Sequence, residues 1–117
     1  MLGMIVEDDP DLSFIFGEAL QAAGFEVEIF HQGGSALARL AQPPEPDMII
    51  LDYHLPQASG EEILAYVRAR LANTKIIMAS SDPRIVGLDA DMVLIKPVLF
   101  TEMRAAIQCL MGKECNP

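Results

Sequence analysis

Reactive side chains stand directly after apolar runs at four places in the sequence. They are the acids at 7–9 after the run 2–6, Asp52 after the run 47–51, Ser80 at the end of the run 75–80, and Lys96 after the run 92–95. Two carboxylates 4 Å apart repel by about 4 kcal/mol at an effective dielectric constant of 20, so clustered acids need a cation or a raised pKa. Mg²⁺ prefers carboxylates together with water and phosphate oxygens, and an aspartate can become an aspartyl phosphate. These residue types suit binding of Mg²⁺ and a phosphoryl group together.

The elements that must position these side chains alternate between strand and helix. Continuous apolar runs at 47–51 and 75–80 are typical of central parallel strands covered on both faces. The alternating stretch 25–30 predicts a half-exposed edge strand. Helical periodicity covers the ranges 10–23, 34–42, 60–71 and 99–111. Asp9 suits the N-cap of the first of these helices, and Pro10 suits its first turn.

Strands that alternate with helices predict an α/β fold, in which helices cover both faces of a parallel sheet. For five strands in a doubly wound sheet, the favoured strand order is the flavodoxin-like 2-1-3-4-5. Ligands bind such sheets at the carboxyl ends of the strands, where the strand order reverses. That point lies between strands 1 and 3, so Glu7, Asp8 and Asp52 are predicted to converge at the rim of a crevice.

The segment between the fourth and fifth strands, 81–91, is too short for more than about two helical turns. Pro83 can open a helix there, but Gly87 weakens it by roughly 1 kcal/mol relative to alanine. The sequence therefore predicts a short or irregular fourth helix, and we expect it to be mobile.

Length and composition set limits on the class of protein. The 117 residues fit one domain, which we expect at 1–112 with a C-terminal tail at 113–117. The net charge of −9 argues against direct binding of nucleic acid. No apolar run approaches the roughly 20 residues that cross a bilayer, and the acidic N-terminus is unlike a signal peptide, so we expect a cytoplasmic protein. We expect neither cysteine, Cys109 nor Cys115, to form a structural disulfide there.

From about residue 2 to 111, the sequence resembles the receiver domain of bacterial two-component response regulators. "VEDDP" resembles the acidic pair of that family at Glu7 and Asp8, and "IILDYHLPQASG" resembles its phosphoacceptor strand and loop, with Asp52 as the acceptor. "IIMASS" resembles the strand that carries a hydroxyl, here Ser80, and "LIKP" resembles the Lys-Pro motif at Lys96. The four motifs occur in the family's order and at fitting spacing.

The resemblance implies a phosphoacceptor signalling domain rather than an ordinary enzyme. It implies that Asp52 accepts a phosphoryl group from a phosphohistidine of a sensor histidine kinase or a phosphotransfer protein. It also implies a Mg²⁺ ion, held by Asp8 and Asp52 directly, by Glu7 mostly through water, and by the backbone carbonyl of His54. Lys96 and the Ser80 hydroxyl would each bind a phosphoryl oxygen, which fits the need of phosphoryl transfer for charge neutralisation.

The resemblance further implies a conformational change that an output domain or a target protein reads. It also implies a cis Lys96–Pro97 peptide bond, and it allows a homodimer.

The sequence departs from the family pattern at the fourth helix and at Val93, which stands where an aromatic switch residue is common. His54 and Asp82 occupy positions at which the family tunes dephosphorylation, and His54 is otherwise an ordinary loop histidine. His31 ends the second strand away from the site and receives no role.

Three alternatives to the receiver function remain. A phosphatase with an aspartate nucleophile would want an acid where His54 stands. A flavin- or nucleotide-binding module would want a phosphate-cradling loop in place of "EDDP". A receiver-like interaction module that is not phosphorylated remains the main alternative.

Overall fold

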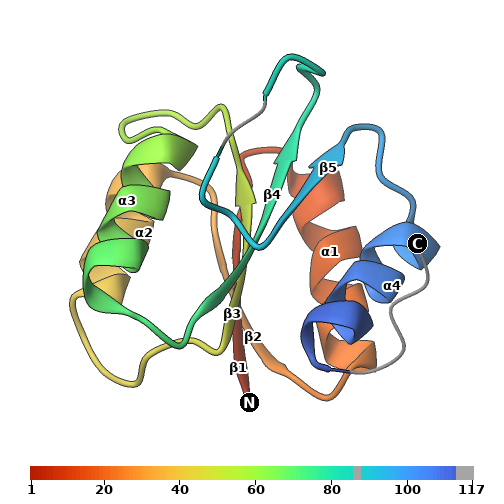
Figure 1. Ribbon diagram of the computed structural model, residues 1–117, viewed down its shortest axis with the longest axis horizontal. Helices are drawn as coiled ribbons and strands as arrows, with labels where there is room; N and C mark the ends of the chain where they lie inside the picture. Colours follow the sequence, from red (N-terminus) through yellow and green to blue (C-terminus); the bar gives the residue numbers. More distant parts are fainter. Residues whose placement is uncertain (86–87, 113–117) are drawn as a thin grey trace.

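The computed structural model describes residues 1–85 and 88–112, and it has a five-stranded parallel sheet with helices on both faces (Figure 1). The elements in chain order are β1 (Leu2–Val6), α1 (Pro10–Ala22), β2 (Glu26–Phe30), α2 (Gly33–Leu40), β3 (Met48–Asp52), α3 (Gly60–Arg70), β4 (Lys75–Ser80), β5 (Met92–Ile95) and α4 (Phe100–Leu110). The strand order, β2-β1-β3-β4-β5, confirms the predicted doubly wound fold.

The core lies in two layers, one on each side of the sheet. Helices α2 and α3 cover one face, and α1 and α4 cover the other (Figure 1). Every residue of β3 is buried, as expected of a central strand, whereas β2 at the edge has only exposed and half-buried residues. The apolar runs of the sequence therefore become the inner strands that hold the reactive residues at their carboxyl ends.

The ends of the helices follow local sequence signals. The Asp9 carboxylate caps α1 by accepting hydrogen bonds from the amides of Asp11 and Leu12, at 2.9 and 3.3 Å. The Ser59 hydroxyl caps α3 in the same way, accepting from the Glu62 amide at 3.2 Å. Acids occupy the first turn of α3 and arginines its last turn, which suits the helix dipole.

The connection from β4 to β5 is irregular, as the sequence predicts. Its described residues, 81–85 and 88–91, contain a turn but no helix. Pro83 lies in that turn, while Gly87 falls outside the described residues. The described residues therefore contain four helices, and the helix labelled α4 follows β5. The expected mobility of this segment stays a prediction.

The structure also bears on the expectations about the cysteines, the C-terminal tail and membrane spans. Cys109, on α4, is disulfide-bonded, so the expectation that neither cysteine pairs is wrong for Cys109. Cys115 and the predicted tail at 113–117 lie outside the described residues. Within the described residues, every helix is too short or too polar to cross a membrane.

Candidate functional site

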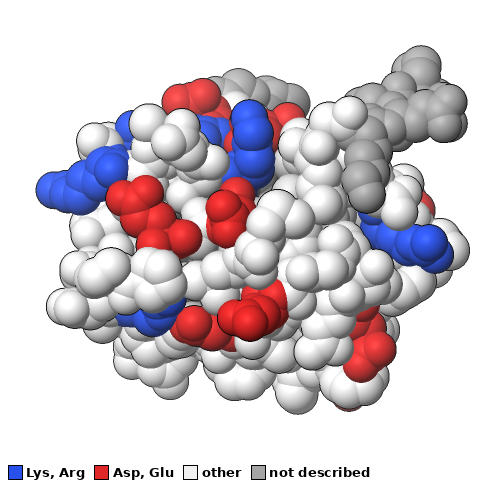
Figure 2. Space-filling model, turned by 90° about the horizontal axis from the view of Figure 1, so that it is seen from below, with Lys and Arg blue, Asp and Glu red and all other residues white. Residues whose placement is uncertain are grey.

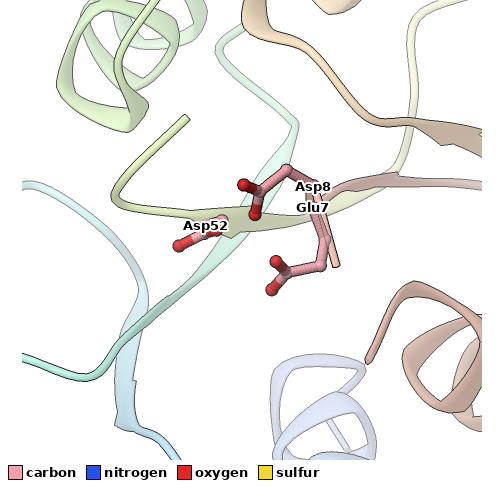
Figure 3. A group of neighbouring side chains, drawn as sticks. All are labelled: Glu7, Asp8 and Asp52. Carbon is pink, nitrogen blue, oxygen red and sulfur yellow. The ribbon is translucent and has the colours of Figure 1, made fainter. Parts of the chain in front are cut away.

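Three carboxylates meet at the carboxyl ends of the neighbouring strands β1 and β3 (Figure 3). Val6 pairs with Leu51, so Glu7 and Asp8 leave β1 beside Asp52, the last residue of β3. One oxygen from each of Glu7, Asp8 and Asp52 lies within 4.8 Å of the others. Glu7 is fully buried, Asp52 is 5% exposed and Asp8 is open to solvent. The predicted convergence is confirmed, although Asp52 is the end of the strand and not the residue after it.

Lys96 brings a positive charge to this cluster from the end of β5. Its Nζ lies 2.8 Å from Glu7 Oε1 and 3.4 Å from Asp52 Oδ1. The Lys96 amide donates to the carbonyl oxygen of Ser80 at 2.7 Å, which fixes the chain where it leaves the sheet. The Lys96–Pro97 peptide bond is cis, as the family resemblance implies.

Burial governs the electrostatics of the cluster. Burial and the neighbouring Asp52 raise the pKa of Glu7 from its ordinary 4.5 to about 7, against the opposing effect of Lys96. Burial by itself lowers the pKa of Lys96, but the carboxylates of Glu7 and Asp52 outweigh it, and the pKa of Lys96 is raised. The ammonium therefore stays charged, whereas Glu7 can hold a proton near neutral pH.

Ser80 ends β4, the strand next to β3, and its hydroxyl is fully buried. The Ser80 Oγ accepts a hydrogen bond from the Asp82 amide at 3.0 Å. Among the described residues, no hydrogen bond joins this hydroxyl to the three acids. The structure thus places Ser80 on the strand beside Asp52, oriented by the chain that follows it.

The loop after Asp52 is held closely against the start of α3. The His54 amide donates to Asp52 Oδ1 at 3.2 Å, and its ring meets the Tyr53 ring edge-on at 4.8 Å. The Tyr53 hydroxyl donates to the Glu61 carboxylate on α3. An open cavity of about 520 Å³ lies beside this loop, lined by Asp8, Tyr53, His54, Leu55, Pro56, Ser59 and Glu61. An incoming group can therefore reach the exposed side of the cluster.

Gly60 allows this loop to pack closely. A Cβ atom at this position would lie 2.5 Å from the backbone oxygen of Asp52 and 2.8 Å from the Cα of Tyr53. The Gly60 amide also donates to the Tyr53 carbonyl at 3.0 Å. The position of Asp52 therefore depends on a backbone contact that only glycine permits.

The sequence places His31 away from the site, and this prediction is wrong, because the structure brings His31 to the backbone of Glu7. Its Nδ1 lies 2.9 Å from the backbone oxygen of Glu7, at hydrogen-bonding distance. The pairing of Val6 with Phe30 sets the ends of β1 and β2 side by side, so their next residues, 7 and 31, are neighbours. Comparing the ends of neighbouring strands would have indicated this contact.

The acidic residues present suit a hard divalent cation. The Lys96 ammonium lies 2.8 Å from the fully buried Glu7 Oε1 and 3.4 Å from Asp52 Oδ1, so one positive charge faces a cluster of three carboxylates. This excess of negative charge favours a bound cation, and carboxylate oxygens are the ligands that Mg²⁺ prefers. Figure 2 shows the opposite end of the molecule, where acidic side chains are scattered over the surface and do not form one cluster.

Comparison with protein families matches residues 4–108 to the response regulator receiver domain. Among curated relatives, the transcriptional regulatory protein PrrA of Mycobacterium leprae is 32% identical over 116 residues, covering 94% of this chain and 49% of the relative. The phosphate regulon regulatory protein PhoB of Rhizobium meliloti is 35% identical over 117 residues, covering 93% and 51%. The chain thus spans about half the length of the curated relatives it matches.

Solved structures of similar proteins share the fold. The Mn²⁺-bound response regulator Rcp1 superposes with a TM-score of 0.82 at 22% identity, covering 99% of this chain and 98% of the other. The response regulator TrrA of Thermotoga maritima, in complex with Mg²⁺ and beryllium fluoride, gives 0.80 at 27% identity, covering 94% and 99%.

Proposed function

The chain belongs to the family of response regulator receiver domains, and on that premise we propose that it accepts a phosphoryl group onto Asp52. The donor is a phosphohistidine of a sensor histidine kinase or of a phosphotransfer protein. The observation that carries the proposal is the meeting of Glu7, Asp8 and Asp52 within 4.8 Å, with the Lys96 ammonium beside them.

In the proposed reaction, a carboxylate oxygen of Asp52 attacks the phosphorus atom of the phosphohistidine. The new O–P bond forms as the N–P bond breaks, and the electron pair of that bond stays on the imidazole nitrogen. Asp52 suits this role because it is almost buried and its Oδ1 is oriented by the His54 amide at 3.2 Å. Positioning matters most here, since phosphoryl transfer needs little covalent machinery from the protein.

Lys96 and Ser80 are proposed to bind the oxygens of the phosphoryl group. The Lys96 ammonium already lies 3.4 Å from Asp52 Oδ1, so a phosphoryl group on Asp52 would arrive next to it. The Ser80 Oγ accepts from the Asp82 amide, and its own proton stays available to donate. Both contacts would strengthen as negative charge collects on the oxygens.

The acidic residues are proposed to hold Mg²⁺, with Asp8 and Asp52 as direct ligands, Glu7 acting through water, and the His54 backbone carbonyl completing the protein ligands. The bound ion supplies positive charge that neutralises the phosphoryl oxygens during transfer. We propose that the exchange takes place in the cytoplasm, and that an output domain or a target protein reads the resulting change of conformation.

The direct test is phosphorylation by a small-molecule phosphodonor, followed by intact-protein mass measurement. In Mg²⁺ the protein should gain the mass of one phosphoryl group, and in chelator it should gain none. Asp52→Asn should abolish the mass gain. Asp8→Ala should abolish the labelling that depends on Mg²⁺. Lys96→Ala should weaken the conformational response to phosphorylation.

Asp11→Asn is the matched control, because Asp11 is an exposed acid on α1 outside the cluster. It should label as the unmodified protein does. If Asp52→Asn gains the same mass at the same rate, the acceptor assignment is wrong. If the unmodified protein never gains mass with phosphodonor or kinase, the chain is instead an interaction module of receiver type.

A further inference from the structure

The connection between β4 and β5 is held at its two ends by different bonds. At its start, the Asp82 amide donates to Ser80 Oγ at 3.0 Å, and this is the hydroxyl proposed to contact the phosphoryl group. At its end, Asp91 is joined to Ile76 of β4 twice. The Asp91 amide donates to the Ile76 carbonyl at 3.0 Å, and the Ile76 amide donates to Asp91 Oδ2 at 2.7 Å.

Arg68, in the last turn of α3, strengthens the second of these two ends. Its Nε donates to the Asp89 carbonyl at 2.6 Å and its Nη2 to Asp91 Oδ2 at 2.9 Å. Its Nη1 donates to the Thr74 carbonyl at 3.2 Å, so all three nitrogens are used. The side chains of Arg68 and Asp91 are only 23% and 24% exposed, which makes this pair stronger than an open surface pair.

Apolar contacts hold the same end of the connection. Leu88 and Ala90 pack against the buried cluster that α2 and α3 form with the sheet. The start of the connection differs, because its bonds are local. The Ile85 amide donates to the Asp82 carbonyl at 3.2 Å, and Arg84, whose side chain is 88% exposed, bonds to the Asp82 carboxylate. Within the described residues, no hydrogen bond ties 82–85 to α3.

We infer that Arg68 is a positioning residue that fixes residues 88–91 and confines the response to phosphorylation to the turn at 82–85. The inference rests on the proposed phosphorylation of Asp52. A phosphoryl oxygen that accepts the Ser80 proton draws the hydroxyl toward it, and the Asp82 amide bonded to that hydroxyl follows. The displacement stops at the residues held by Arg68, since segments with few buried contacts rearrange first.

The anchor can be tested without phosphorylation, by residue-resolved amide hydrogen exchange. Arg68→Gln should speed exchange at the amides of Ile76 and Asp91 by about tenfold, as loss of a charge-assisted hydrogen bond predicts. Arg70→Gln is the matched control, because Arg70 lies in the same turn of α3 with its guanidinium 4.5 Å from the centre of the Tyr66 ring. The control should leave both amides unchanged.

Arg68→Lys keeps the charge but not the three-armed geometry, and it should give intermediate exchange. This variant also serves if Arg68→Gln does not fold. If the amides of Ile76 and Asp91 exchange equally fast in the Arg68 and Arg70 variants, Arg68 does not anchor residues 88–91.

The confinement is tested by repeating the exchange with Mg²⁺ and beryllium fluoride as a phosphoryl mimic. The unmodified protein should change protection at 82–85 and not at 88–91, whereas Arg68→Gln should extend the change to 88–91. A change at 88–91 in the unmodified protein would overturn the inference. Mass gain with a phosphodonor is measured on the same samples and shows whether Asp52 is phosphorylated. The hydrogen exchange measured without phosphodonor or mimic shows separately whether Arg68 anchors residues 88–91.

Discussion

The connections that leave the site after β3 and after β4 are built in opposite ways. The loop from β3 to α3 is pinned along its length by backbone contacts, including the Gly60 amide on the Tyr53 carbonyl and the Gly33 amide on the Pro56 carbonyl. The connection from β4 to β5 has no helix in its described residues and is held at its two ends. The proposed acceptor Asp52 therefore stands on the more firmly held side of the site, and the hydroxyl of Ser80 stands on the side that we propose responds.

This difference suggests a division of labour. The proposed transfer to Asp52 requires a carboxylate held in one place before the donor arrives, because a small misplacement of reacting atoms lowers the rate sharply. Signalling requires a segment with two arrangements of similar free energy, whose populations the phosphoryl group shifts. Val93 is partly buried against the core and has no ring to rotate, so the turn after Ser80 is the better candidate for the responding element.

The largest expected effect concerns the acids that both connections flank. Because the pKa of Glu7 is about 7 in the folded protein and 4.5 ordinarily, the folded state holds a proton that the unfolded chain has lost between these values. Without metal, the contribution of Glu7 to the free energy of unfolding should therefore be full below pH 4.5 and be lost as the pH rises to about 7, by on the order of a few kcal/mol.

Denaturant titrations across this pH range, in chelator and in Mg²⁺, measure that fall. Mg²⁺ favours the charged carboxylate, so it should reduce the fall and raise stability most near pH 7. Glu7→Gln should remove this fall between pH 4.5 and about 7 in chelator. An equal fall in Glu7→Gln would show that another group titrates.

A smaller effect is expected from crowding the fixed connection. Gly60→Ala places a Cβ 2.5 Å from the Asp52 carbonyl oxygen, and we expect it to lower the free energy of unfolding by roughly 1–3 kcal/mol. Gly17→Ala is the control, since its Cβ would meet the nearest atom, of Ile29, at an ordinary 3.5 Å. Chemical denaturation should show a loss for Gly60→Ala only. An unchanged midpoint there would mean that this connection is looser than its contacts suggest.

The smallest effect is expected where a side chain adds to the backbone contacts. Tyr53→Phe removes the hydroxyl that bonds Glu61 while keeping the ring against His54. The denaturation midpoint should fall by less than in Gly60→Ala, and Mg²⁺ should bind more weakly by calorimetry because the His54 loop is less well held. Tyr66→Phe should change neither quantity. Identical behaviour of the two tyrosine variants would exclude a positioning role for Tyr53.

Local patterns predicted most of the fold. The strands 2–6, 75–80 and 92–95 have the bounds that the apolar runs indicate, and Asp9 caps α1 as expected. The meeting of Glu7, Asp8 and Asp52 was predictable because parallel strands bring their carboxyl ends to one edge of a sheet.

Contacts between residues distant in the chain were not predictable from local patterns. The bonds from Arg68 to Asp89 and Asp91 join a helix to a loop about 20 residues further on, and no periodicity marks them. The contact of His31 with Glu7 depends on the pairing of β1 with β2, which a comparison of the two strand ends indicates and the pattern of either strand alone does not. The disulfide bond of Cys109 was not predicted either, because disulfide bonds are uncommon in the cytoplasm, where the protein is expected.

The location of the phosphoryl group tests the proposed function most directly. The protein is phosphorylated with a small-molecule phosphodonor in Mg²⁺, digested at low temperature and mapped by tandem mass spectrometry. The proposed function predicts one added phosphoryl group, on the peptide that carries Asp52 and on that residue alone. A phosphoryl group found on Asp8, on Glu7 or on a peptide outside the cluster would contradict it.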